Sequence, residues 1–125
     1  MIREYKDYLM DLIEAIDKME QFTEAITYED FKKDEKTIFA VIRALEVMGE
    51  AAKKIPAGAR NKYKHIPWKQ IAGMRDKLIH EYFGVNTQVI WKTVKEDIPL
   101  VKPIIKQMVN DIQWKCARRK AACAL

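Results

Sequence analysis

Apolar residues recur at alternating intervals of three and four along most of the chain, which is the spacing of one face of an α-helix. The first stripe predicts a helix from the N-terminus to about Ile26, followed by a turn over residues 27–30. Its apolar positions are Ile2, Tyr5, Leu9, Leu12, Ile16 and Met19. Charged residues occupy the other faces, so the pattern predicts a helix that packs one side against partner helices.

A second stripe predicts a helix over residues 34–55, which Pro56 and Gly58 end. Its apolar positions are Ile38, Val41, Ile42, Leu45, Met48, Ala52 and Ile55. A mainly charged stripe runs along another face of the same helix, through Phe39, Arg43, Glu46, Glu50 and Lys53. Taken alone, this second stripe is typical of a solvated helix face that carries ion pairs.

The third helix is predicted over residues 67–83, after a connector at residues 57–66. Pro67 suits the first turn of a helix, where its missing N–H costs nothing. Gly84 lies where a left-handed residue commonly caps a helix end. His65, which lies in the connector before Pro67, is interpreted as an exposed loop or pre-helix residue.

The C-terminal part predicts a further long helix that is interrupted once. Asn86 is a suitable N-cap for its first segment. Residues 97–99 predict a break and restart, and Pro103 predicts a kink. The apolar pattern fades near Trp114.

Together these elements predict an all-α fold, an up-and-down bundle of four main helices with the last one broken near Pro99 and Pro103. A length of 125 residues suits one domain. We assign the bundle to residues 1–114 and a basic tail to residues 115–125.

Composition narrows the class of protein further. No stretch approaches the roughly 20 apolar residues of a membrane span, and the charged N-terminus does not resemble a signal peptide, so the expected location is cytoplasmic. Cys116 and Cys123 have no histidine or cysteine companions at metal-site spacing, so neither a metal nor another cofactor is expected. A net charge of +5 favours a polyanionic partner.

Candidate chemistry is concentrated in residues 75–84, RDKLIHEYFG. Arg75 offers a planar fork of donors that matches a phosphate group. His80 can give and take protons near neutral pH, because its unperturbed pKa is about 6.5. Tyr82 offers a hydroxyl for hydrogen bonding or modification.

The helical spacing of these residues has a structural consequence. At about 100° per residue, Arg75 and Tyr82 share a face, whereas His80 lies roughly 140° away from Arg75. One straight helix therefore does not aim Arg75 and His80 at one point, unless its last turn is distorted near Gly84. A symmetric dimer would supply the missing group from a second copy of the helix. Arg75 also needs a carboxylate or a functional cleft, and Glu50 or Glu46 is a candidate partner.

A purely structural interpretation of the same residues is also open. Arg75 would then be a buried ion-pair arginine, His80 a helix-terminal histidine that the helix dipole stabilises, and Tyr82 a core aromatic. Spacing and residue type alone do not exclude it.

Four residues separate Arg75 from His80 and one separates His80 from Tyr82, and this arrangement resembles the signature of the HepT-type branch of the HEPN superfamily. The resemblance extends over residues 34–56, 66–86 and 89–101, and covers roughly residues 1–112. The first of these stretches contains the Gly-Glu-Ala at Gly49, Glu50 and Ala51. The tail, KCARRKAACAL, matches no part of the pattern.

The resemblance implies a helical homodimer with a metal-independent RNA endonuclease site at the dimer cleft, acting as the toxin of a type VII-like toxin–antitoxin pair. It implies that Arg75 holds the phosphate, that His80 acts as acid or base, and that Tyr82 supports the site. Its partner would be a minimal nucleotidyltransferase antitoxin that silences the toxin by adenylylating Tyr82. Separately from the resemblance, we predict that Glu50 is a supporting residue that orients Arg75.

A second function from another class remains open at this point. Helical bundles of this kind can also be non-catalytic, nucleotide- or substrate-binding partners of a nucleotidyltransferase. Arg75 and His80 would then bind phosphate without cleaving RNA. Loss of toxicity on changing His80 separates the two functions.

Overall fold

The computed structural model describes residues 5–73 and 86–123, with side chains described as far as residue 112. Its α-helices are α1 (Tyr5–Thr23), α2 (Tyr28–Lys33), α3 (Glu35–Lys54), α4 (Ala57–Lys62), α6 (Thr87–Lys92) and α7 (Ile98–Cys123). The π-helical segment η2 (Thr93–Asp97) joins α6 to α7, and residues 68–73 are also helical. No strand occurs in these two described ranges, so the predicted all-α fold is confirmed.

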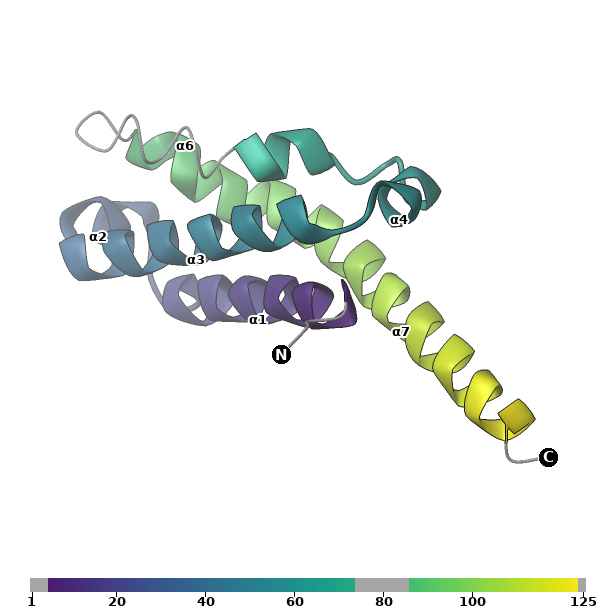
Figure 1. The fold of residues 1–125 in the computed structure, drawn as a ribbon. Coiled ribbons are helices and arrows are strands. Elements are labelled where there is room, and N and C mark those ends of the chain that lie inside the picture. Colours follow the sequence, from purple (N-terminus) through teal and green to yellow (C-terminus); the bar gives the residue numbers. More distant parts are fainter. Residues whose placement is uncertain (1–4, 74–85, 124–125) are drawn as a thin grey trace.

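The helices run up and down beside one another, as the sequence pattern predicts. Helix α1 packs against α3 and α7, and the short α2 at one end contacts α3 and α6 (Figure 1). The helical segment 68–73 lies over α3 on the side away from α1 (Figure 1). The last part of α7 extends past the N-terminal end of α1 (Figure 1).

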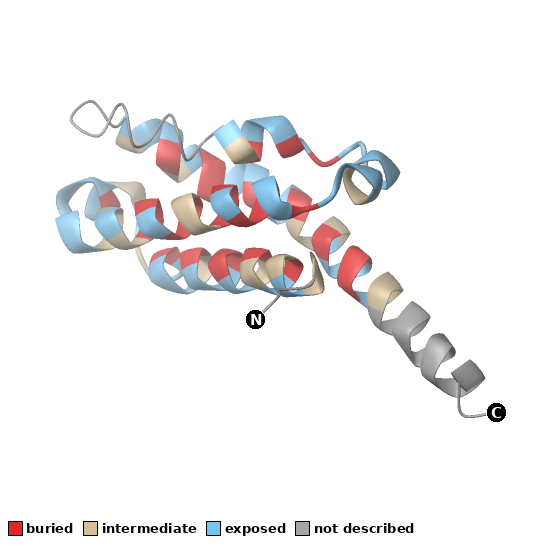
Figure 2. Ribbon diagram, viewed as in Figure 1, coloured by how far each residue is buried: buried red, intermediate tan, exposed pale blue. Residues whose placement is uncertain are grey.

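The core consists of the apolar stripes predicted from the sequence. In α1, Leu9, Leu12, Ile16 and Met19 have no exposed surface. The α3 stripe is buried from Val41 to Ile55, whereas the charged stripe on its other face is largely exposed (Figure 2). Burying a side chain of this size contributes about 1.5–3 kcal/mol, so these stripes account for much of the stability of the bundle.

The turn predicted at residues 27–30 is wrong, because these residues begin helix α2. Helix α1 ends at Thr23, three residues earlier than predicted. Thr27 and Asp30 form a capping box, in which the Thr27 hydroxyl accepts from the Asp30 N–H and the Asp30 carboxylate accepts from the Thr27 N–H. The helix buries Phe31 completely against the ring of Trp91, at 5.1 Å between centroids.

The break predicted at residues 97–99 takes the form of a π-helical segment within a continuous helix. The backbone stays helical from α6 through η2 into α7, and the Ile98 N–H bonds to the carbonyl of Thr93, five residues earlier. Pro99 has no N–H, and a wider turn before it is a common way to accommodate such a residue. Pro103 lies inside α7.

The C-terminal helix is longer than the apolar pattern indicates. Helix α7 runs to Cys123, whereas the pattern fades near Trp114. The boundary between a bundle at residues 1–114 and a tail at residues 115–125 stays a prediction. None of the helices in the described ranges is long and apolar enough to cross a membrane.

Candidate functional site

Arg75, His80 and Tyr82 lie outside the described residues, so their predicted roles stay predictions. The structure does describe both ends of the segment that carries them, at residue 73 on one side and residue 86 on the other. Helical residues 68–73 lead into it, and α6 follows it. These two flanking elements fix the positions of residues 73 and 86, between which the segment lies in the sequence.

On the N-terminal side, two buried residues fix the helical segment 68–73 to the core. Trp68 and Ile71 are buried. The indole N–H of Trp68 donates to the carbonyl of Tyr63 at 3.1 Å, and Ile66 between them is also buried. The connector is therefore folded tightly, and it fixes the direction in which the chain approaches Arg75.

On the C-terminal side, Asn86 caps α6 as predicted. Its side-chain oxygen accepts from the N–H groups of Gln88 at 2.9 Å and Val89 at 3.4 Å. Helix α2 then holds α6 in place, because the hydroxyls of Tyr28 and Thr87 lie 3.1 Å apart. Sequence reasoning missed this role of α2, although the Thr27–Asp30 capping pattern could have indicated the helix.

Glu50, the predicted orienting residue for Arg75, lies on the exposed face of α3. It lines a groove of about 400 Å³ between α1 and α3, together with Tyr8, Asp11 and Glu46. Glu46 forms an ion pair with Arg43 at 3.4 Å. The groove lining contains no residue of the helical segment 68–73. A role for Glu50 toward Arg75 therefore stays a prediction.

A strongly basic stretch precedes the motif in the sequence and ends at Arg75. Its charge was not used in the sequence analysis. Residues 51–75 contain no Asp or Glu. Their seven cations are Lys53, Lys54, Arg60, Lys62, Lys64, Lys69 and Arg75. The predicted exposure of His65 within this stretch is confirmed. A count of acidic residues in a sliding window would have revealed the stretch.

A pocket of about 580 Å³ lies within this basic stretch, between α4 and the start of the helical segment 68–73. Arg60, Lys64 and Lys69 line it together with the amides of Asn61 and Gln70. All of these groups can donate hydrogen bonds, and no acidic side chain contributes to the lining. In the described part of the chain, no three His, Cys, Asp or Glu side chains gather as metal ligands would.

Tyr63 fixes the end of α4 to the C-terminal helix. Its hydroxyl donates a short hydrogen bond to the carboxylate of Asp111 on α7. Burial, followed by the hydrogen bond to Asp111 and the charge of that carboxylate, raises the pKa of Tyr63 to about 12 from its ordinary value of 10.0. Ionised Tyr63 would face the Asp111 carboxylate, so the fold favours the neutral phenol.

We therefore expect alkali to weaken this fold partly through Tyr63. The unfolded chain ionises the phenol near pH 10, whereas the native chain keeps it neutral to about pH 12, so this contribution is complete below pH 10 and is lost as the pH rises toward 12. Tyr63→Phe should lower the free energy of unfolding at pH 8 by about 1–2 kcal/mol, through the lost hydrogen bond. Urea unfolding at pH 8 and pH 11 should show a smaller alkaline loss in Tyr63→Phe than in the native protein. Equal losses in both would contradict this assignment.

The described residues form a small all-helical bundle with a basic stretch at residues 51–75. In the sequence, this stretch leads into the arginine–histidine–tyrosine segment. A family model described as Ribonuclease HepT-like matches residues 12–108. The chain belongs to the HepT-like ribonuclease family, and the predicted resemblance is confirmed.

Individual relatives agree with this membership. A protein of Thermococcus cleftensis named "Probable ribonuclease HepT" is 59% identical over 102 residues, which are 82% of this chain and 93% of that protein. A "Putative RNase" of Methanocaldococcus jannaschii is 47% identical over 113 residues, which are 90% of this chain and 93% of that protein. In the same organism, a "Gamma-glutamylcyclotransferase and putative RNase" is 42% identical over 112 residues, which make up 50% of its length. No solved structure matches the chain.

Proposed function

We propose that this protein is a metal-independent RNA endonuclease that acts as the toxin of a toxin–antitoxin pair in the cytoplasm. The observation that carries the proposal is the position of the motif within the family match. Residues 12–108 match a ribonuclease family, and this range contains Arg75, His80 and Tyr82 at the spacing of the HepT-type signature. RNA is the substrate that membership in a ribonuclease family implies.

The proposed reaction is a transesterification at phosphorus. The 2′-oxygen of one nucleotide forms a bond to the adjacent phosphorus, while the bond from phosphorus to the 5′-oxygen of the next nucleotide breaks. The 2′-hydroxyl loses a proton and the departing 5′-oxygen gains one; His80 carries out one of these two transfers, and solvent water carries out the other. Arg75 binds the non-bridging phosphate oxygens as negative charge builds up on them. The products are a 2′,3′-cyclic phosphate and a 5′-hydroxyl.

The proposed site is shared between two subunits. Arg75 and His80 point about 140° apart on an ideal helix, so one copy of the helix does not direct both at one phosphate. A two-fold interface that includes residues 67–83 would place Arg75 of one subunit beside His80 of the other.

The proposed partner is a minimal nucleotidyltransferase antitoxin that attaches an adenylate to Tyr82. Tyr82 follows Arg75 by seven residues, so on an ideal helix its hydroxyl opens on the same side as the guanidinium. A phosphodiester at that position would compete with RNA for Arg75.

The test of the proposed function is cleavage of RNA by the purified full-length chain in the presence of EDTA. We expect cleavage that EDTA does not affect, with a cyclic phosphate and a 5′-hydroxyl at the new ends, and a dimer by light scattering. Mass spectrometry of the fragments identifies the ends. Cleavage that requires magnesium, or fragments with a 5′-phosphate, would overturn the mechanism. RNA binding without any cleavage would favour the non-catalytic partner instead.

A further inference from the structure

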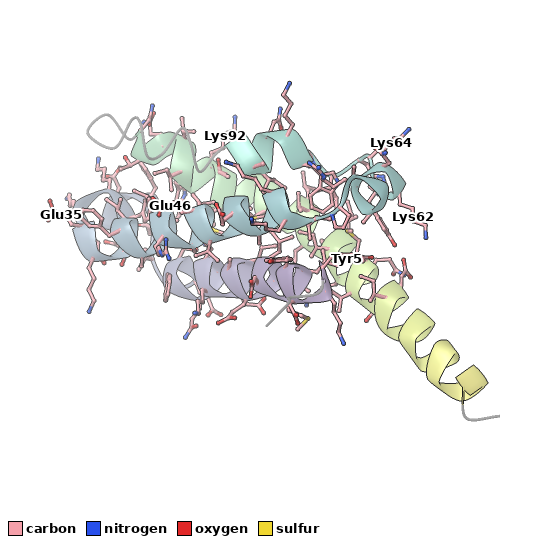
Figure 3. The ribbon with its side chains drawn as sticks, in the orientation of Figure 1. Tyr5, Glu35, Glu46, Lys62, Lys64 and Lys92 are labelled. Carbon is pink, nitrogen blue, oxygen red and sulfur yellow. The ribbon has the colours of Figure 1, made fainter. Side chains whose placement is uncertain are left out.

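Four cations on α4, on the turn at residues 63–65 and on the helical segment 68–73 form a surface that the proposed chemistry does not use. We define the α4 basic surface as Arg60, Lys62, Lys64 and Lys69. The three lysines are exposed, and Arg60 is half-buried in the wall of the 580 Å³ pocket. Figure 3 shows Lys62 and Lys64 pointing outward at the end of the molecule opposite Glu35.

The charge of this surface is not neutralised within the described part of the chain. Among residues 5–73 and 86–112, the ion pairs lie on α1, α2, α3 and α7, and none includes a member of the α4 basic surface. The surrounding residues 51–75 contain no carboxylate at all. Concentrated positive charge of this kind raises the local concentration of polyanions and speeds their association.

The pocket adds hydrogen-bond donors to this charge. The Nε of Arg60 is buried and has no acceptor among the described residues. Such a donor is costly unless the guanidinium finds an acceptor, and an anion in the pocket would draw the guanidinium toward its oxygens. The amides of Asn61 and Gln70 lie in the same lining and can donate to the same anion.

The surface is built on a rigid support rather than on a loose loop. Tyr63 bonds to Asp111 on α7, and Trp68 bonds back to the carbonyl of Tyr63. Ile66 between them is buried. Lys62, Lys64 and Lys69 therefore extend from a backbone that is fixed to the core, which lowers the entropy lost when they bind a ligand.

We propose that the α4 basic surface binds the phosphate backbone of the RNA next to the cleavage site. Lys69 precedes Arg75 by six residues, so the two lie no more than about 22 Å apart along the chain, within the length of a short RNA segment. Lysines on phosphates supply affinity without reading the bases, so this contribution is independent of sequence and sensitive to salt. The inference rests on the proposed function only in taking the polyanion to be RNA.

The test compares the native chain with Lys62→Gln/Lys64→Gln/Lys69→Gln in the full-length protein. The probe is an unstructured RNA of about 20 nucleotides, longer than the span that one small domain usually contacts. Its 2′-O-methyl groups prevent transesterification, so binding is measured by fluorescence anisotropy whether or not the protein cleaves RNA. A failure of the proposed function would therefore appear in the cleavage assay, and a failure of this inference would appear in the binding assay.

We expect the triple variant to bind the RNA about tenfold more weakly at moderate salt. The slope of log K against log salt should fall by about 2, because each phosphate contact on a single strand contributes about 0.7. The matched control is Lys32→Gln/Lys33→Gln/Lys36→Gln, which removes the same charge from exposed positions on α2 and the start of α3. That control should bind within about twofold of the native chain.

Two results would overturn the inference. One is an equal loss of affinity in the two triple variants, which would mean that net charge alone attracts the RNA. The other is native RNA affinity in the first variant combined with lost binding of a nucleotidyltransferase, which would assign the surface to an acidic protein. Circular dichroism should show native helicity in both variants, since all six lysines are exposed.

Discussion

Replacing His80 by alanine should abolish the proposed RNA cleavage and the growth arrest expected of the proposed toxin, while the protein stays folded. The imidazole is the proposed proton carrier, and removal of such a group lowers the rate by about 100-fold or more. Cleavage of a labelled RNA in EDTA and circular dichroism of the same samples measure the two properties. The matched control is His65→Ala, which removes the other histidine from an exposed position and should leave cleavage unchanged.

The shared site can be tested with the same variant. Arg75→Ala and His80→Ala should each be inactive alone, yet a mixture refolded together should recover about a quarter of the native activity. Random assortment makes half of the dimers heterodimers, and each heterodimer keeps one of its two sites intact. Arg75→Lys should also be severely impaired, since an ammonium group does not reproduce the bidentate fork. An active His80→Ala protein would contradict the mechanism, and an inactive mixture would contradict the sharing of residues between subunits.

Co-expression with a minimal nucleotidyltransferase should place an adenylate on Tyr82 and silence the ribonuclease. The phosphodiester adds a negative charge beside the proposed position of Arg75, and the adenine base adds bulk where RNA would bind. We expect intact-mass analysis to show the added adenylate, peptide analysis to place it on Tyr82, and the modified protein to lose RNA cleavage.

Two variants make this experiment specific. Tyr82→Phe should remain unmodified and should resist silencing, provided that it retains cleavage. Tyr8→Phe changes a half-buried tyrosine on α1 and should be modified and silenced as the native protein is. An adduct on another residue, or a modified protein that still cleaves RNA, would exclude Tyr82 as the switch.

The sequence predicted the long helices well, because their buried stripes follow the helical period without interruption. Leu9 to Met19 in α1 and Val41 to Ile55 in α3 are buried as predicted. Helix α2 was not predicted, since six residues are too few to show a period. Its capping box and the buried Phe31 specify it through one local contact and one distant contact.

The candidate site was only partly predictable for a similar physical reason. The motif predicts the chemical groups, whose roles stay a prediction, and the family match supports the ribonuclease class. The frame around the motif depends on contacts between residues that are distant in sequence, such as Tyr63 with Asp111 and Tyr28 with Thr87. No periodicity encodes such pairs. The charge of the α4 basic surface could be predicted from the lack of acidic residues in this stretch. Its pocket could not, because it depends on the hydrogen bond from the Trp68 indole to the carbonyl of Tyr63.

The π-helical segment has a consequence for the length of the chain. Buried residues follow one another at Ile90, Val94, Ile98, Val101 and Ile105, so the intervals of four, four, three and four keep one continuous apolar seam across η2. A π-helical turn holds one residue more than an α-turn, so deletion of one residue within η2 can be absorbed by a return to an α-turn, whereas insertion of one residue would rotate everything downstream by about 100° and move the seam of α7 away from α1. Lys95 donates to the carbonyl of Thr23 at 2.8 Å and lies over the ring of Trp91, so its identity contributes to the packing of η2, whereas the exposed Glu96 and Asp97 are more open to change. The segment therefore tolerates other side chains at these two positions but not an added residue.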